Sequence, residues 1–161
     1  MHPPDRLGVS LTYSWEPFTF RGRHLTFADH RVTRLSAHDC SHWGAVVYKW
    51  EGLIAEGDHA GEMGILIGES QDLRQRIKQY VSGTQKSGNK FWREQFLTKG
   101  NIHLYILKFD QIEVPVTFGE SLTLTSDAVA SNNVRLVLEQ LLVLREVIRE
   151  DRKRWVVNRK L

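Results

Sequence analysis

The chain has a single cysteine, Cys40, among its 161 residues, so a disulfide bond within the chain is excluded. No apolar run approaches the roughly 18–20 residues that a membrane-spanning helix needs. The first five residues also lack the apolar segment of a signal peptide. We therefore expect a cytoplasmic protein that has no membrane partner.

The sequence also lacks a strong excess of either charge. It carries 22 lysines and arginines against 19 aspartates and glutamates, and its formal net charge is +3. This balance permits nucleic-acid binding without requiring it, so the placement of the basic residues matters more than their number. The length suits one domain with a sizeable core, or a domain of roughly 100 residues with an added elaboration.

The first 43 residues have the texture of β-structure. Stretches 11–15, 18–20 and 25–27 alternate large apolar with small polar residues, a period typical of half-buried strands. Between the last two, Arg21-Gly22-Arg23 predicts a hairpin turn, because Gly22 readily takes a positive φ. We expect residues 1–43 to form an N-terminal β extension and residues 44–161 to form the main domain.

The main domain mixes strand and helix periods. Strands are expected over 44–50, 63–68 and 102–109, and helices over 72–81, 89–97 and 134–150. Asp72, Asn89 and Asn133 are suited to cap these helices. Segment 115–127 is ambiguous, with an extra strand and a turn as its interpretation, and 152–160 is a basic tail. The order β-β-α-α-β-α predicts an α+β fold, a small antiparallel or mixed sheet flanked by helices.

Arg76 stands out on the helix expected over 72–81. Leu73, Ile77 and Tyr80 form the apolar stripe of that helix, and Arg76 leaves from the edge of the stripe. A fixed guanidinium beside a core suits phosphate binding, because it offers several donors and never deprotonates. The alternative is an arginine whose stem lies on the core while its head reaches water.

Glu139 is the second candidate. The helix expected over 134–150 is apolar around most of its circumference, which predicts that it is largely buried. Its narrow polar stripe holds Arg135, Glu139 and Glu146. Glu139 could bind a divalent cation through its carboxylate, with water completing the shell. The alternative is an i, i+4 ion pair with Arg135.

Taken in order, these segments resemble the GIY-YIG nuclease family. Val46-Val47-Tyr48 is similar to its first motif. Leu66-Ile67-Gly68 is similar to its second motif, with Leu66 in place of the tyrosine and with the Ile-Gly that allows a tight exit into the helix. Four further residues follow in the same order as in the family: Arg76, Tyr80, Glu139 at the position of the metal-binding glutamate, and Asn158 at the position of the closing asparagine.

The resemblance implies a divalent-metal-dependent endonuclease that hydrolyses phosphodiester bonds of DNA, branched or damaged DNA included. A single Mg²⁺ or Mn²⁺ on Glu139 would polarise the scissile phosphate. Tyr48 would orient or deprotonate the attacking water, and Arg76 would neutralise charge on the phosphoryl oxygens. Tyr80 would donate a hydrogen bond. For both tyrosines the alternative is an ordinary aromatic residue of the core.

Leu66 separates two versions of this hypothesis, because leucine neither donates nor accepts a hydrogen bond. Either another polar group such as Lys49 compensates and the site cleaves DNA, or the chain is a catalytically impaired relative that binds nucleic acid or a protein. A third alternative is that the order of the motifs is accidental and the chain is a non-enzymatic α+β interaction domain.

Two further groups complete the candidates. Arg21 and Arg23 lie beside aromatic residues in the expected hairpin, a pattern that suits either a DNA backbone or solvated charges. The other candidates for contact with nucleic acid are Lys49, Arg74, Lys78 and Lys86. The alternation in His38-Asp39-Cys40-Ser41-His42 would place three zinc ligands on one face if extended, but a fourth ligand is missing nearby and a polar connector is favoured.

Overall fold

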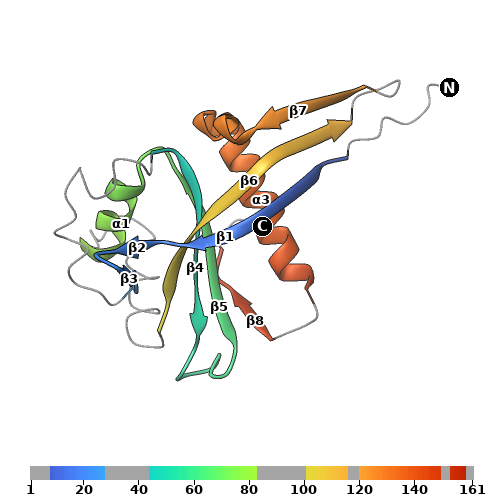
Figure 1. Cartoon of the computed structure of the whole chain (residues 1–161). Coiled ribbons are helices and arrows are strands. Elements are labelled where there is room, and N and C mark those ends of the chain that lie inside the picture. The colour runs from blue at the N-terminus through green and yellow to red at the C-terminus, as the bar shows by residue number, and fades with distance from the viewer. Residues whose placement is uncertain (1–7, 28–43, 83–100, 116–119, 150–152, 159–161) are drawn as a thin grey trace.

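The computed structural model describes residues 8–27, 44–82, 101–115, 120–149 and 153–158. Its centre is a mixed sheet with helices against it, an α+β fold (Figure 1). Along the sheet the strand order is β1 (Ser10–Pro17), β6 (His103–Pro115), β4 (Val46–Leu53), β5 (Met63–Ser70) and β8 (Arg154–Val156), and β7 (Ser121–Thr125) pairs with β6. These pairings are antiparallel except that of β5 with β8, which is parallel.

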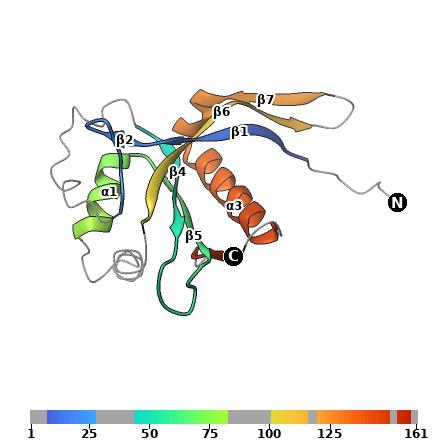
Figure 2. The ribbon, with the colours of Figure 1, turned by 60° about the horizontal axis from the view of Figure 1, so that its bottom comes forward.

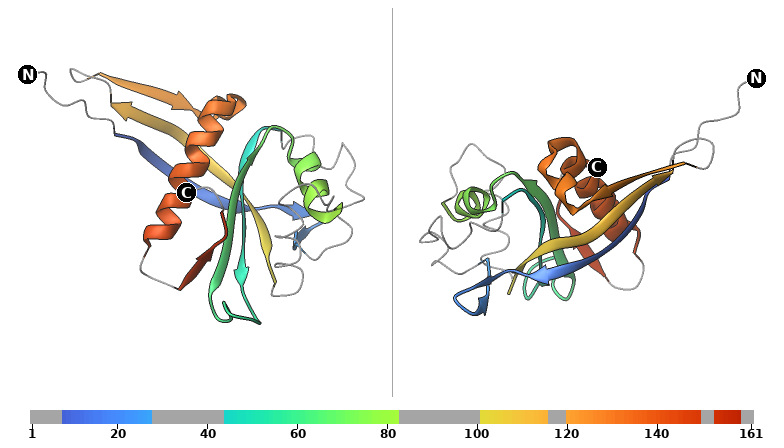
Figure 3. Two further views of the ribbon diagram at one scale, coloured as in Figure 1. Left: turned by 180° about the vertical axis from the view of Figure 1, so that it is seen from behind. Right: turned by 45° about the horizontal axis from the view of Figure 1, so that its top comes forward.

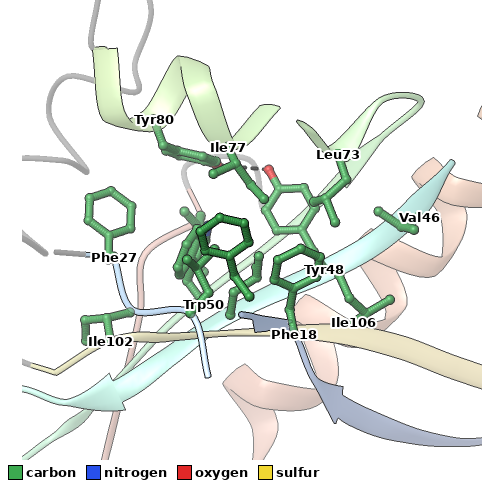
Figure 4. Packing of buried hydrophobic residues seen from close by; sticks show 14 of the residues in the cluster. Phe18, Phe27, Val46, Tyr48, Trp50, Leu73, Ile77, Tyr80, Ile102 and Ile106 are labelled. Carbon is green, nitrogen blue, oxygen red and sulfur yellow. Dashed lines mark hydrogen bonds between the residues drawn. The ribbon is translucent and has the colours of Figure 1, made fainter. Parts of the chain in front are cut away.

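The helices α1 (Leu73–Ser82) and α3 (Asn132–Ile148) lie on opposite faces of the sheet (Figure 3). The alternation of side chains along β4 explains how both faces acquire a core. Tyr48 and Trp50 point towards α1 and pack with its apolar stripe (Figure 4). Val47 points the other way and packs with residues of α3.

The helix α1 follows the predicted pattern. Leu73, Ile77 and Tyr80 are all buried, as their spacing indicates. The Asp72 carboxylate accepts a hydrogen bond of 3.0 Å from the backbone N–H of Gln75. Asp72 therefore caps the helix, and this prediction is confirmed.

The N-terminal segment forms strands, as predicted. β1 pairs with β6 and so belongs to the central sheet. The hairpin of β2 (Thr19–Phe20) and β3 (Arg23–His24) turns through Arg21 and Gly22, both of which have positive φ, of 51° and 72°. Two positive φ values in succession are typical of the type I′ turn that matches the twist of a hairpin. Phe18 and Phe20, at and beside this hairpin, pack into the core beneath α1.

The prediction that the last helix is largely buried is wrong. α3 buries three apolar residues, Leu138, Leu142 and Val143, together with Arg135 and Glu146. Most of its other apolar residues are exposed. Ion pairs explain this choice of face, since Arg135 binds Glu69 of β5 and Glu146 binds Arg154 of β8.

Three local predictions are settled by the remaining elements. The ambiguous segment after residue 115 does contain a strand, β7, and the 3₁₀ helix Ser126–Ala130 follows it. The expected cap Asn133 is wrong, because α3 begins at Asn132 and Ser131 is its N-cap. The basic tail contains a strand that the sequence analysis missed, β8. The helix expected over 89–97 lies outside the described residues.

The far ends of β1, β6 and β7 form a ribbon that passes the start of α3 and diverges from the rest of the helix (Figure 1 and Figure 2). Among the described residues, no helix has both the length and the apolar character needed to cross a membrane.

Candidate functional site

Two tyrosine hydroxyl groups meet beneath α1. Tyr48 comes from the central strand β4 and Tyr80 from α1, and their oxygens lie 3.0 Å apart in a hydrogen bond (Figure 4). Both side chains are buried, with exposed fractions of 2% and 5%. The sequence alone suggested each as a candidate, and the fold brings the two into contact.

Gly68 of β5 makes room for this pair. Gly68 lies directly opposite Tyr48 in the antiparallel ladder. A Cβ atom added to Gly68 would overlap the Tyr48 hydroxyl and ring, so any other residue would displace the tyrosine. From the sequence, the expected role of this glycine is a tight exit from the strand into the helix. In the structure its role is the close approach of Tyr48.

The electrostatic surroundings of the pair include both other candidates. Burial raises the pKa of Tyr48 well above its ordinary value, and the neighbouring Tyr80 adds to the increase. Burial also raises the pKa of Tyr80, although its hydrogen bond to Tyr48 partly opposes this. Arg76 lowers the pKa of both tyrosines and Glu139 raises it. Hence both hydroxyls are protonated at neutral pH, and the charges of Arg76 and Glu139 affect the pKa of both.

Arg76 is half-buried one helical turn before Tyr80. It lines a polar cavity of about 570 Å³ between α1, the end of β5 and the start of α3. The other residues around this cavity are Glu69, Ser70, Gln71, Asp72, Gln75, Gln79, Asn132 and Arg135. The cavity therefore presents acidic, basic and neutral polar side chains beside Arg76.

Arg135 fixes one wall of the cavity. Its side chain is 2% exposed, and its Nε donates to the Glu69 carboxylate at 2.8 Å. Its other nitrogens donate to the backbone oxygens of Val129 and Ala130 and to the side chain of Asn132. Sequence reasoning missed this link, because it considered Arg135 only as a partner for Glu139 one turn later. Nothing in the sequence pattern indicates that Arg135 pairs with Glu69, which lies 66 residues earlier in the chain.

Glu139 lies half-buried on α3, one turn after Arg135. The helix packs on the face of the sheet opposite Tyr48, and Glu139 is not among the residues lining the polar cavity. Its charge nevertheless acts on both tyrosine hydroxyls. Arg76 and Glu139 thus approach the tyrosine pair from helices on opposite faces of the sheet.

Leu66 packs in the core on the same face as Tyr48. It is 5% exposed and lies directly opposite Trp50 in the ladder. The indole Nε1 of Trp50 is buried and has no hydrogen-bond partner among the described residues. The position at which the resemblance would place a tyrosine is therefore filled by a packed aliphatic side chain beside a donor that lacks an acceptor among the described residues.

Asn158 has a backbone partner. The N–H of Ile67 donates to its Oδ1 at 3.0 Å, and its Nδ2 donates to the Ile67 oxygen at 2.5 Å. β8 pairs with β5 only up to Ile65, so the Asn158 amide extends the pairing by two residues. The side chain thus acts as a continuation of the strand at the sheet edge.

The expected nucleic-acid-binding residues are scattered. Lys49 is buried, forms an ion pair with Glu51 at 2.6 Å, and points to the face opposite Tyr48. Its ammonium also lies over the rings of Trp15 and Tyr105. Arg74 and Lys78 line a shallow cavity of about 270 Å³ on α1, with Asp72 and Gln75. Arg21 and Arg23 are exposed on the hairpin that packs near α1.

Several earlier candidates cannot be placed. Lys86 and the segment with His38, Cys40 and His42 lie outside the described residues. Within the described ranges, no three histidine, cysteine, aspartate or glutamate side chains group together as for a metal ion. Comparison with family models, curated proteins and solved structures finds no match to this chain.

Proposed function

We propose that this protein is a divalent-metal-dependent endonuclease of the GIY-YIG type, which hydrolyses phosphodiester bonds of DNA. The observation that carries the proposal is the arrangement of four residues that the sequence singled out. Tyr48 and Tyr80 share a hydrogen bond, and the charges of Arg76 and Glu139 both act on their hydroxyls. A cation and an anion whose charges both act on two neutral hydroxyls suit a phosphate and a hard metal ion.

The donor chemistry fits Mg²⁺ or Mn²⁺. Glu139 supplies a carboxylate oxygen, the ligand that these ions prefer, and water would complete the coordination shell. Glu139 would therefore hold the ion. When bound, the ion would supply Lewis-acid polarisation of the scissile phosphate.

Arg76 and the two tyrosines have separate roles in the proposed reaction. The Arg76 guanidinium stays charged and would bind the phosphoryl oxygens from the polar cavity. The raised pKa of Tyr48 makes it a poor general base at neutral pH. We therefore assign Tyr48 and Tyr80 the role of hydrogen-bond donors. Two hydroxyls hold two hydrogens, and the bond between them uses one, so one hydrogen remains for a further acceptor.

Nicking of supercoiled plasmid tests the proposal. Purified protein should cleave in Mg²⁺ or Mn²⁺ and not in chelator. Glu139→Gln and Arg76→Ala should each lower the rate by about 10²–10³, the usual cost of losing a well-placed electrostatic contact. Glu120→Gln and Lys153→Ala, which change exposed charges elsewhere, should cleave as the parent does. A parent without metal-dependent cleavage of supercoiled, linear, branched or single-stranded DNA would refute the proposal.

A second candidate function is binding of nucleic acid without cleavage. It is favoured by the burial of both tyrosine hydroxyls and by Leu66, which is packed in the core. Both candidates predict DNA binding that weakens steeply as salt rises, through release of counterions. Only the second predicts such binding together with no metal-dependent cleavage. Binding that is absent at low salt would remove both and favour a protein partner.

A further inference from the structure

The solvent side of α3 is apolar. Its exposed apolar residues are Leu136, Val137, Leu141, Leu144, Val147 and Ile148, and the fractions exposed range from 37% to 66%. Isolated exposed leucines and valines are ordinary in soluble proteins, but a continuous strip of them is not. The strip is the more unusual because the same helix buries Arg135 and Glu146.

The strip has the spacing of a helix-packing seam. Val134, Val137, Leu141, Leu144 and Ile148 follow one another at intervals of three, four, three and four residues. This is the a/d pattern by which one helix packs its side chains against another. The buried residues of α3 belong to other positions, and within the seam Val134 alone packs against the core on the sheet.

The two ends of the seam differ in shape. At its N-terminal end, Val134 and Val137 line an apolar hollow of about 200 Å³ together with Ile112, Val114 and Leu124 of the neighbouring ribbon. At its C-terminal end, Ile148 is the most exposed of the large apolar residues, at 66%. One end of the strip is therefore a recess and the other end is a projection.

The area of the strip suits a dimer. The six exposed residues leave on the order of 500 Å² of apolar surface in water, comparable with the largest patch of a typical monomer. Val9 and Leu122 extend it over the ribbon. A stable interface buries about 800 Å² per partner, with an apolar centre and a polar rim. The strip therefore supplies the apolar centre of such an interface and most of its area.

We propose that α3 packs against α3 of a second copy of this chain, antiparallel, about a two-fold axis at Leu141. A two-fold axis joins the same surface of both copies, so each residue faces its counterpart reflected about the centre of the seam. Leu141 then meets Leu141 of the second copy, Val137 meets Leu144, and Val134 meets Ile148. The projecting Ile148 of each copy enters the hollow of the other. This inference does not depend on the proposed nuclease activity.

Analytical ultracentrifugation of the full chain tests the dimer. The parent should sediment with twice the mass of the chain at micromolar concentration. Leu144→Glu should weaken the dimer at least about 100-fold, because it places a charge at the centre of an apolar contact. Leu53→Glu is the matched control, since Leu53 is 58% exposed at the far end of β4, and it should dimerise as the parent does. A monomeric parent, or a dimer that Leu144→Glu leaves intact, would overturn the proposal.

Disulfide trapping tests the direction of the helices. In a Cys40→Ser background, Leu141→Cys should form a covalent dimer under mild oxidation. Ile148→Cys alone should not, but it should cross-link when mixed with a Val134→Cys chain. Cross-linking of Ile148→Cys with itself would show parallel helices and contradict the proposed axis. Circular dichroism of each variant separates loss of the dimer from loss of the fold.

Discussion

At the scale of single residues, the buried hydroxyl groups of Tyr48 and Tyr80 make the free energy of unfolding depend on pH. A hydroxyl with a pKa raised above its unfolded value of 10.0 contributes stability that is fully present below pH 10 and is lost as pH rises further. The reason is that the unfolded chain ionises there while the buried hydroxyls resist ionisation.

We therefore expect the urea midpoint of the parent to fall between about pH 10 and about pH 11, the region above the ordinary pKa of tyrosine. The double variant Tyr48→Phe/Tyr80→Phe should lose about 1 kcal/mol of unfolding free energy at pH 7, from the missing hydrogen bond. It should also show a shallower alkaline decline. An equal decline in both proteins would contradict the burial of the pair.

Leu66 gives the second prediction at this scale. Because Leu66 fills a packed core opposite Trp50, Leu66→Tyr should lower the unfolding free energy by about 1–3 kcal/mol through overpacking. Leu66→Met, which keeps the volume, should cost less than about 1.5 kcal/mol. Chemical denaturation measures both. In the nuclease proposal, plasmid cleavage by folded Leu66→Tyr should stay near the parent rate. A variant as stable as the parent and much more active would mean that the leucine impairs an otherwise intact site.

At the scale of the elements, Asn158 joins the end of the chain to the edge of β5. Two hydrogen bonds to the Ile67 backbone should contribute about 1–3 kcal/mol together. We expect Asn158→Ala to lose that amount in chemical denaturation and to speed hydrogen exchange at the Ile67 amide. Asn101→Ala, at an exposed position, should stay within about 0.5 kcal/mol of the parent. Unchanged protection of the Ile67 amide would contradict this role.

The elements also show what periodicity can and cannot predict. The sequence predicts β4, β5 and α1 correctly. In each of them the spacing of the apolar residues fits only one kind of element, and those residues are the ones that the fold buries. α3 has apolar residues on nearly every side, so its pattern does not select the buried face. Partners far apart in the sequence, Glu69 and Arg154, make that selection through Arg135 and Glu146. β8 was missed because three residues are too short to show a period.

At the scale of the whole molecule, the candidate site depends on both layers. Arg76 was predictable from helical spacing, since the edge of an apolar stripe is a local property. The contact of Tyr48 with Tyr80, and the room that Gly68 leaves for it, depend on how α1 lies over the sheet. Glu139 comes from the opposite layer, so only the complete fold brings its charge to the tyrosines.

The proposed mechanism requires that Arg76 and Glu139 act together on one phosphate. Its most direct test is a double-mutant cycle on the single-turnover rate of plasmid cleavage at saturating Mg²⁺. We predict that Arg76→Ala and Glu139→Gln each slow cleavage by about 10²–10³, and that the double variant is little slower than the worse single variant. Effects that simply multiply, or single variants that cleave at the parent rate, would contradict the claim.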